Sequence, residues 1–373
     1  MRIGVPKEIK NHEYRVGLTP QSVAELRALG HEIWVETQAG AAIGFSDADY
    51  MKAGAHIALE AVKVFAEAEL IVKVKEPLAS ERMRLHPGHT LFTYLHLAPD
   101  RAQTDELLAS GATCIAYETV TDAQGRLPLL APMSEVAGRM SIQVGASCLE
   151  KVHGGRGVLL GGVPGVAPGK VVILGGGVVG SQAAAMAIGL GADVSILDKN
   201  MDTLRRLDAQ YGNRITTLYS TGAAVREQVL AADLVIGSVL IPGATAPKLV
   251  SAAMVRQMKP GAVLVDVAID QGGCAETSRP TTHTHPTYVV DEVVHYCVAN
   301  MPGGVARTST LALNNATLPF VIALADKGTR RALEADLHLR HGLNVAAGAV
   351  TNPGVAAAHQ LPCVPAEEVL ARL

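Results

Sequence analysis

Three glycines and an aspartate are spaced as a dinucleotide site requires. Gly175, Gly177 and Gly180 follow the apolar run 171–174 in a G-x-G-x-x-G pattern, and Asp198 ends the next apolar run. The first glycine permits a tight turn, the second lets backbone approach a pyrophosphate, and the third lets a helix pack on a strand. The phosphates would then meet free N–H groups at the positive end of that helix. Because a carboxylate at position 198 would hold a ribose and repel a 2′-phosphate, we expect NAD rather than NADP.

The same segment has two other interpretations. An Ala- and Gly-rich core can produce this pattern by chance, and the run 171–192 carries no charge, as a membrane-spanning helix of about 20 apolar residues would. Three consecutive glycines near its start would weaken such a helix, however, and Pro168 and Gly169 precede a run of strand character. The order of strand, glycine turn, helix and acid favours dinucleotide binding.

His96 is the first candidate for acid–base chemistry. Alternation along the expected strand 90–98 places Phe92, Tyr94 and His96 on one face, with His96 near the carboxyl end, where α/β sheets place ligands. A neutral imidazole with a pKa of about 6.5 is suited to proton exchange during hydride transfer. Most of the thirteen histidines should be structural or on the surface, so the position of His96 is what singles it out.

Arg15 and Lys75 are candidates for binding an anionic substrate. Arg15 lies in a loop before an expected helix, and its planar fork could hold a carboxylate in bidentate fashion. The alternative is a surface salt bridge to Glu8 or Glu13. Lys75 lies near the end of a strand, where it could bind a carboxylate or polarise a carbonyl oxygen. Its alternative is an ordinary pair with Glu76.

Other polar residues at strand and helix ends have less distinctive positions. Asp270 ends an apolar strand and brings a carboxylate to the nucleotide edge, whereas Asp266, earlier in that strand, is expected to be structural. Ser134, near the start of a long helix, is either an N-cap or a donor to the cofactor phosphates. His283 and His285 invite a metal interpretation, but no second ligand pair of standard spacing accompanies them, so we expect no metal.

The composition excludes several classes of protein. With 373 residues, a net charge of −3 and 3% aromatic residues, the chain lacks the basic patches and stacking platforms of nucleic-acid binders. The five cysteines are widely spaced and form no C-x-x-C pair, which is typical of reduced thiols in a cytosol. The first ten residues lack the apolar region of a signal peptide, so we expect a cytoplasmic protein without membrane contact.

Strands and helices alternate along the chain, which predicts an α/β fold with parallel sheets. We expect two domains: a Rossmann-type, doubly wound NAD domain over 130–305, inserted into a second α/β substrate domain formed by 1–129 and 306–373. Long helices, from about 132 to 151 and from about 306, should join them, and Pro319 should kink or split the second one. A cleft between the domains is the expected place for a small substrate.

With these residues in place, the chain resembles L-alanine dehydrogenases over its full length. The resemblance implies NAD-dependent, mostly hexameric enzymes that interconvert L-alanine with pyruvate and ammonia, with hydride transfer from the alanine α-carbon to nicotinamide C4. The matching segments are far more specific than a glycine fingerprint, and they are 1–20, 69–77, 91–100, 128–141, 173–180, 266–273 and 296–310.

The resemblance implies a role for each candidate. Arg15 and Lys75 look like the ligands of the substrate carboxylate and carbonyl, His96 like the general acid/base, and Asp270 like the second catalytic residue. Nonpolar side chains such as Leu130 and Met133 should limit the size of the substrate. The implied cofactor contacts are Ser134, Gly175, Gly177, Val178, Val179, Gly180, Asp198, Ser220, Val239, Leu240, Val267, Ala268, Ile269, Asp270, Arg279, Val298, Ala299, Asn300 and Met301.

One position departs from the family pattern. Members often carry a basic residue where this chain has Thr203, and that residue contacts the adenosine half of the cofactor. Arg205 could replace it from the next turn, and otherwise the affinity for NAD should be lower.

Three other functions compete with this interpretation. The NAD-binding subunit of proton-translocating transhydrogenase shares much of the fold, but His96 and Lys75 look catalytic and no membrane segment follows. A saccharopine-type dehydrogenase would need a larger, more polar pocket. A non-enzymatic interaction protein would be expected to carry a charge run, a heptad repeat or a low-complexity tail, and the sequence has none.

Overall fold

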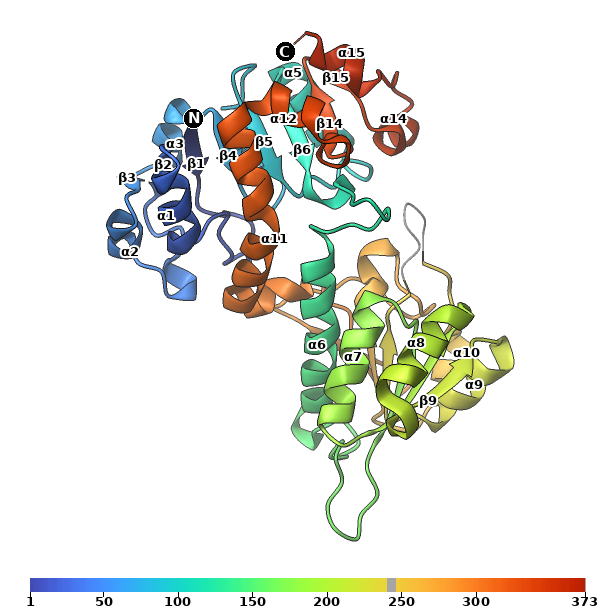
Figure 1. The fold of residues 1–373 in the computed structure, drawn as a ribbon. Coiled ribbons are helices and arrows are strands. Elements are labelled where there is room, and N and C mark those ends of the chain that lie inside the picture. Colours follow the sequence, from blue (N-terminus) through green and yellow to red (C-terminus); the bar gives the residue numbers. More distant parts are fainter. Residues whose placement is uncertain (240–245, 373) are drawn as a thin grey trace. The chain divides into compact units, whose positions relative to one another are not determined.

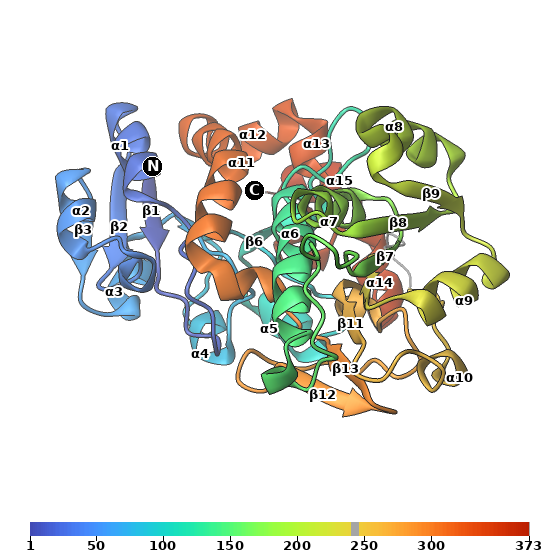
Figure 2. The same cartoon turned by 90° about the horizontal axis from the view of Figure 1, so that it is seen from below.

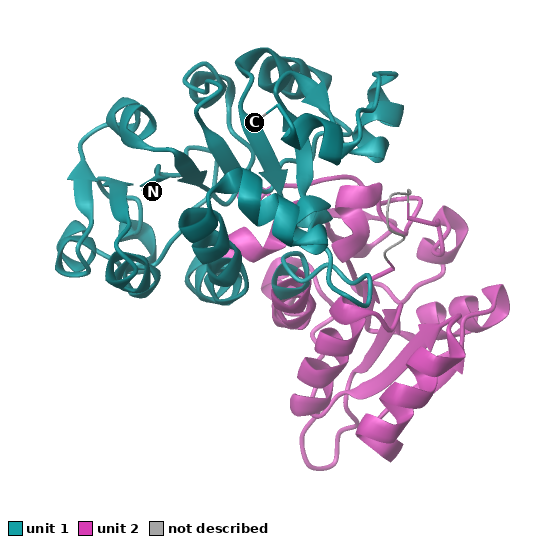
Figure 3. Ribbon diagram, turned by 45° about the horizontal axis from the view of Figure 1, so that its top comes forward, with its two compact units in different colours: residues 1–133, 305–373 teal, residues 134–304 magenta. Residues whose placement is uncertain are grey.

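The computed structural model describes residues 1–239 and 246–372, which form two compact units (Figure 3). Unit 1 comprises Met1–Met133 and Val305–Leu373, and unit 2 comprises Ser134–Gly304. Unit 2 is therefore one continuous segment of chain, flanked by the two segments of unit 1. Both units are α/β, each built on its own sheet.

The sheet of unit 1 has eight strands, and β1, β4, β5 and β6 are adjacent and parallel in it (Figure 1). Their carboxyl ends therefore share one edge of the sheet. β14 pairs antiparallel with β6 and with β15, and extends the sheet on one side. In spatial order the strands are β15 (Ala349–Val350), β14 (Leu343–Ala346), β6 (Thr113–Ala116), β5 (Thr90–Thr93), β4 (Leu70–Val72), β1 (Arg2–Val5), β2 (Glu32–Glu36) and β3 (His56–Ala58).

Several helices of unit 1 begin at a residue whose side chain caps the first turn. α1 begins at Pro20 because the Thr19 side chain accepts from the Ser22 backbone N–H and proline needs no donor at the first position. The core of this unit packs Leu91, Leu107 and Val345 together, fully buried. Its helices are α1 (Pro20–Ala28), α2 (Asp47–Lys52), α3 (Ala61–Glu67), α4 (Ala79–Arg82), α5 (Arg101–Ser110), α11 (Ala306–Lys327), α12 (Thr329–Ala335), α13 (Leu337–Arg340), α14 (Pro353–His359) and α15 (Ala366–Leu370).

α11 is the longest helix, and Pro319 does not split it as one sequence alternative proposed. Proline removes the hydrogen bond to the carbonyl of Asn315, and because both residues lie on the exposed side, water can satisfy that carbonyl. Among the described residues, the segment Met301–Lys327 is long and apolar enough to cross a membrane by length and composition. Its polar face is used within the fold, however: the Asn314 amide donates to Gly17 O and accepts from Thr19 N.

The sheet of unit 2 has seven strands, and all of them except β12 run parallel to one another. The chain starts at β7, proceeds outward through β8 and β9, and returns to β10 on the other side of β7. This reversal of strand order is the feature beside which doubly wound sheets bind ligands. In spatial order the strands are β12 (Thr287–Val290), β13 (Val293–Tyr296), β11 (Val263–Asp266), β10 (Leu234–Gly237), β7 (Lys170–Leu174), β8 (Asp193–Asp198) and β9 (Thr216–Tyr219).

Helices α6 and α7 lie side by side in unit 2 (Figures 1 and 2). They approach closely because Gly138 has no side chain: a Cβ there would lie 2.2 Å from the Val179 carbonyl oxygen. The helices that carry residues of this unit are α6 (Ala131–Cys148), α7 (Val178–Gly189), α8 (Met201–Tyr211), α9 (Gly222–Ala231) and α10 (Ala252–Val255), with 3₁₀ turns η5 (Val267–Gln271) and η6 (Met301–Val305).

Two segments differ from the sequence expectations. The strand expected over 90–98 ends at Thr93, so His96 lies in a loop rather than in the strand. The C-terminal segment 343–359, for which no individual strand or helix is predicted from the sequence, forms β14, β15 and α14. Pairing of Leu343 with the distant Ile115 explains why no local pattern revealed that strand.

Candidate active site

Three of the predicted residues follow the carboxyl ends of three adjacent strands in unit 1. Arg15 lies in the segment after β1, Lys75 comes three residues after β4, and His96 comes three residues after β5. Because these strands are parallel neighbours, the residues that follow them gather at one edge of the sheet. This is the edge at which open α/β sheets bind ligands.

Arg15 is buried and held by a carboxylate. Its Nε and one terminal nitrogen donate to the two oxygens of Glu13 at 2.7 and 2.6 Å, while its other terminal nitrogen lies 3.1 Å from Met133 Sδ. Burial lowers the pKa of Arg15, but the Glu13 carboxylate outweighs it and leaves the pKa raised, so the guanidinium is a fixed cation. Of the two partners proposed from the sequence, Glu13 is therefore the one that binds Arg15, and the pair is buried rather than on the surface.

A buried ionic cluster supports the segment that carries Lys75. Glu8 accepts from the backbone N–H groups of Val74 and Lys75 at 2.7 and 3.2 Å, and from Lys73 Nζ at 3.1 Å. Lys73 also pairs with Glu81 at 2.7 Å. Burial raises the pKa of Glu8, whereas the two carboxylates outweigh burial at Lys73 and raise its pKa. Lys73 is thus a structural cation, and Lys75 remains the candidate lysine for binding a substrate.

The Lys75 side chain is 14% exposed, and its nitrogen lies 4.0 Å from a Glu76 oxygen. At that distance the carboxylate provides charge without a hydrogen bond. A second backbone contact, from Thr93 Oγ1 to the Lys75 carbonyl at 3.0 Å, ties this segment to the end of β5. Lys75 and His96 are therefore carried by segments that are joined to each other.

His96 is exposed and has a left-handed backbone with φ of 48°. Such a φ is uncommon for a residue other than glycine and needs support from its surroundings. Glu118, two residues after β6, supplies that support: it accepts from the His96 N–H at 2.6 Å and from the Leu95 N–H at 3.2 Å. The turn aims the imidazole out of the core, where it can exchange protons.

Tyr94 links the arginine to the histidine. Its ring stacks on that of His96 with centroids 5.9 Å apart, and its hydroxyl donates to Leu129 O at 2.5 Å. Burial raises the pKa of Tyr94, and the nearby Arg15 cation partly opposes that rise. This edge of unit 1 therefore presents two cations and an imidazole, a set that can bind a small carboxylate and move a proton beside it.

In unit 2 the glycine turn has the geometry that a phosphate requires. Gly175 has φ of 102°, and a Cβ on Gly180 would lie 1.8 Å from Gly175 O, so α7 can begin this close to β7 only with glycine there. Gly177 is the N-cap of α7 and offers no side chain to its N–H groups, and a Cβ there would meet nothing within 4 Å. The donors at this helix end are thus accessible to an anion.

Asp198 is bonded to the same turn. Its two carboxylate oxygens accept from the N–H groups of Gly176 at 2.6 Å and Asn200 at 2.7 Å. Ser220, another predicted contact, follows β9 and donates its N–H to Asp198 O at 3.0 Å. The acid is therefore held beside the glycine turn, as a ribose ligand would need. These features fit a dinucleotide, with phosphates at the start of α7 and the ribose at Asp198.

The remaining predicted cofactor residues also follow parallel strands of this sheet. Asp270 is exposed in the turn η5, whereas Asp266 is buried and accepts from Cys274 N at 2.8 Å and Ser278 Oγ at 2.5 Å, a structural role. Leu240 lies outside the described residues. Val239 follows β10. Val267, Ala268, Ile269 and Asp270 follow β11, and Val298, Ala299, Asn300 and Met301 follow β13. Val178 and Val179 begin α7.

Ser134 and Arg279 are placed by other elements. α6 begins at Ala131, so Ser134 lies inside the helix and the N-cap alternative is wrong. The Arg279 guanidinium carbon lies 4.2 Å from the centroid of the Tyr288 ring, and the Arg279 backbone N–H donates to the Tyr288 hydroxyl oxygen at 2.8 Å. His283, once considered for a metal, bonds to Asn300 O at 3.1 Å, and no cluster that could hold a metal occurs among the described residues.

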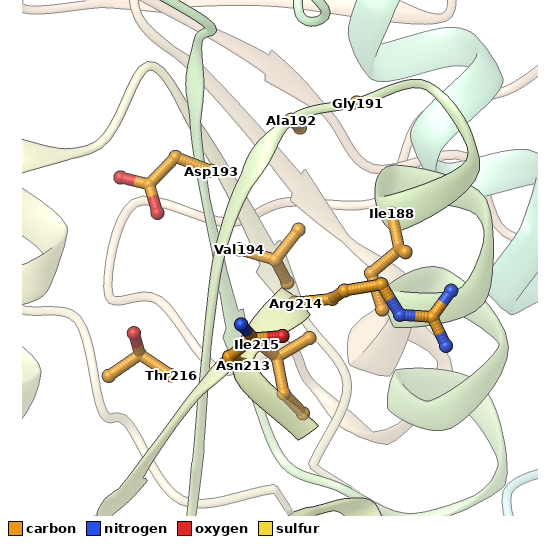
Figure 4. A pocket seen from close by; sticks show the side chains of 9 residues that line it. All are labelled: Ile188, Gly191, Ala192, Asp193, Val194, Asn213, Arg214, Ile215 and Thr216. Carbon is orange, nitrogen blue, oxygen red and sulfur yellow. The ribbon is translucent and has the colours of Figure 1, made fainter. Parts of the chain in front are cut away.

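A cavity of about 330 Å³ in unit 2 lies elsewhere (Figure 4). Asp193, Val194 and Thr216 line it, and these residues begin β8 and β9. It is therefore at the amino ends of strands whose carboxyl ends carry Asp198 and Ser220. Ligands of open parallel sheets bind at the carboxyl ends, and this cavity is not the dinucleotide site.

The supporting carboxylates were not found from the sequence. Glu118 was not proposed as part of the site, and Glu8 and Glu13 were named only as surface partners of Arg15. Glu13 lies two residues from Arg15 and Glu118 follows the strand beside β5, so their strand-end positions were the available signal.

Comparison with known proteins identifies close relatives. The family models described as Alanine dehydrogenase/PNT, N-terminal domain and C-terminal domain match residues 4–137 and 141–353. The alanine dehydrogenases of Halomonas elongata and Mycobacterium tuberculosis are 60% and 55% identical, covering 99% and 100% of this chain and all of their own. Among solved structures, an L-alanine dehydrogenase matches with a TM-score of 0.94 and 55% identity, covering 96% of this chain and 99% of its own. The transhydrogenase from Sinorhizobium meliloti matches with a TM-score of 0.81 and 26% identity, covering 95% of this chain and 99% of its own.

Proposed function

The chain belongs to the alanine dehydrogenase family, and from that premise we propose that it catalyses the reversible, NAD-dependent oxidative deamination of L-alanine to pyruvate and ammonia. The observation that carries the proposal is the edge of unit 1: a guanidinium, an ammonium and an imidazole follow the carboxyl ends of three adjacent parallel strands. Pyruvate and alanine both carry a carboxylate next to the reacting carbon, which such a set of groups suits.

Arg15 binds the substrate carboxylate. Its guanidinium is charged and fixed by Glu13, and one terminal nitrogen also lies against Met133 Sδ, a weak acceptor. A carboxylate is a stronger acceptor than a thioether, so replacing the sulfur contact favours binding. Lys75 binds the carbonyl oxygen of pyruvate, whose partial negative charge it stabilises. Two anchored points give the substrate one orientation, which is chiefly positioning catalysis.

His96 is the general acid and base. NAD⁺, when bound, accepts the hydride of the alanine α-carbon. His96 takes a proton from the water that attacks the resulting iminium carbon, and returns a proton to the amine that leaves as ammonia. Glu118 accepts a hydrogen bond from the His96 backbone N–H, which keeps the orientation of the imidazole constant through both proton transfers. Asp270 is the second catalytic residue, a carboxylate beside the water and the nicotinamide ribose.

The cofactor is NAD, bound by the glycine turn and Asp198. The N–H groups at the start of α7, where no side chain caps the helix, would hold the phosphates, and Asp198 would hold the adenosine ribose, where its negative charge disfavours a 2′-phosphate. The other contacts are those that the family resemblance implies, from Ser134 to Met301.

The proposal extends to assembly and compartment. We propose a cytoplasmic homo-oligomer, with a hexamer favoured by the resemblance. The loop between η3 (Lys151–His153) and β7 exposes Leu159, Val163 and Val166, apolar side chains that burial between subunits would shield from water. Analytical ultracentrifugation of the purified protein measures the number of subunits.

The function is tested by initial rates of NADH formation at 340 nm with NAD⁺ and L-alanine, alongside L-serine, L-valine and L-lysine. We expect a rate with alanine well above the others and none with lysine, and reductive amination of pyruvate with ammonia in the reverse direction. A chain that binds NADH but oxidises no amino acid would instead be a nucleotide-binding module, the alternative that its likeness to the transhydrogenase supports. A higher rate with L-lysine and 2-oxoglutarate than with pyruvate and ammonia in the reverse direction would favour a saccharopine-type enzyme.

A further inference from the structure

One face of helix α8 covers the glycine turn. A Cβ on Gly176 would lie 2.7 Å from Thr203 Cγ2 and 2.9 Å from Leu207 Cδ1, so both side chains pack over this glycine. Arg206 belongs to the same side, because its terminal nitrogen NH2 donates to Gly176 O and to Ser181 Oγ, each at 3.1 Å. Residues three and four apart share a face of a helix. Thr203, Arg206 and Leu207 therefore form a single face toward the turn.

Arg205 points away from this face. It forms an ion pair with Asp202 at 2.8 Å, and its side chain is 70% exposed. The substitute that the sequence offered for a basic residue at position 203 is thus engaged on the solvent side of α8. Arg206, one residue later, is the arginine that reaches the dinucleotide turn.

The Arg206 guanidinium has no carboxylate partner among residues 1–239 and 246–372. Its contacts with described residues are two hydrogen bonds to neutral oxygens, both made by NH2, and no carboxylate of the described chain forms an ion pair with it. The Gly176 peptide is fixed from both sides, since its N–H donates to Asp198 Oδ2 at 2.6 Å and its carbonyl accepts from Arg206 and Ser181. A cation is thereby positioned at the start of α7, next to the N–H groups that face an anion.

We propose that Arg206 binds the phosphate groups of the dinucleotide at the glycine turn. From the second turn of α8 it supplies the cation that this chain lacks at position 203, and it keeps the affinity for NAD despite Thr203. Nε and the other terminal nitrogen, which make no hydrogen bond to the described residues, are the donors for the phosphate oxygens, and the delocalised charge of a guanidinium suits a phosphate. The inference rests on the proposed NAD site.

The test compares two neighbouring arginines. In Arg206→Gln the charge is lost, while Ser181 Oγ still donates to Gly176 O and Asp198 still accepts from the Gly176 N–H, so the turn is retained. Arg205→Gln is the matched control, with the same change one residue away on the solvent face. Dissociation constants are measured by NADH fluorescence and by calorimetry with ADP-ribose and adenosine, on the full chain. We expect Arg206→Gln to weaken NADH and ADP-ribose roughly tenfold, the effect of about one charged hydrogen bond, and to leave adenosine unchanged.

Two further measurements separate a phosphate contact from a structural role. The loss in Arg206→Gln should shrink as salt is added, because screening weakens the contact in the wild type. Adding Thr203→Lys to Arg206→Gln should restore most of the NADH affinity from the first turn of the same face. Arg205→Gln should bind all three ligands within about twofold of the wild type, as expected for an exposed pair.

Several outcomes overturn the proposal. Unchanged NADH binding by Arg206→Gln would do so, as would an equal loss for adenosine or for Arg205→Gln. Failure of the wild type to bind NADH would reject the NAD site itself, a result distinct from any difference between the variants.

Discussion

Substitution of Gly180 by alanine tests the glycine turn, because the structure leaves no room for a methyl group. The added Cβ would lie 1.8 Å from the Gly175 carbonyl oxygen, whereas real Cβ contacts are essentially never shorter than 3.0 Å. α7 must therefore move from β7 by at least 1.2 Å, the difference between those two distances. The atom in the way is backbone, so no side-chain rotation relieves the clash.

The expected cost follows from that displacement. Overpacking a well-packed site costs roughly 1–3 kcal/mol, and each kcal/mol lowers the Tm of a domain of this size by about 2–4 °C. We expect a Tm lower by about 2–12 °C. A helix start displaced by over 1 Å also misplaces the N–H groups that face the phosphates, each worth about 1.5–3 kcal/mol as a charged hydrogen bond. NADH affinity should fall at least tenfold.

Gly189→Ala is the matched control, since it lies at the other end of the same helix. A Cβ at Gly189 would meet nothing within 4 Å, and alanine is the better helix former. We expect an equal or slightly higher Tm and unchanged NADH affinity. The assays are a thermal melt without ligand and NADH fluorescence titration. Wild-type Tm and affinity in Gly180→Ala would refute the account of the turn.

Three further predictions concern single side chains. Glu13→Gln should raise the KM for pyruvate at least tenfold, because the buried Arg15 guanidinium loses its orienting charge; an unchanged KM in steady-state kinetics would contradict this. Glu118→Gln should lower kcat roughly tenfold with NADH affinity retained, since the charged hydrogen bond to the His96 N–H is weakened; equal kcat would exclude that positioning role. Burial lowers the pKa of His295 from its ordinary 6.5, so the unfolded chain binds its proton first and stability is lost as pH falls below that value. Melts across pH 5–8 should therefore show a flatter profile for His295→Gln than for the wild type, and parallel profiles would refute it.

The fold class and the main chemistry could be predicted from the sequence because their signals are local. Alternating runs gave the α/β class, and the turn around Gly175 together with Asp198 gave the dinucleotide site. Arg15 and Lys75 follow apolar runs, a position visible without knowing which strands are neighbours. Each of these signals lies within about 30 residues of chain, the length of one βαβ unit.

What the sequence did not reveal depends on distant or unusual contacts. β14 pairs with β6 across more than two hundred residues, so its apolar content alone could not place it. His96 was assigned to a strand because alternation continues past Thr93, whereas a carboxylate from the segment after β6 bends the backbone there. A proline breaks most helices, but Pro319 lies on the solvent-exposed side of α11, and the helix continues through it. On α8, Arg206 contacts the glycine turn whereas Arg205 pairs with Asp202 on the solvent side, and which face each arginine occupies could be seen only in the structure.

His96→Ala gives the most direct test of the proposed chemistry, measured as kcat for NADH formation from L-alanine together with the dissociation constant of NADH. The imidazole is exposed and its removal leaves no cavity in the core, so the protein should fold and bind NADH as before. We expect kcat to fall at least a hundredfold, the usual contribution of a general acid and base. A variant that turns over alanine at a rate near that of the wild type would show that proton transfer does not pass through His96.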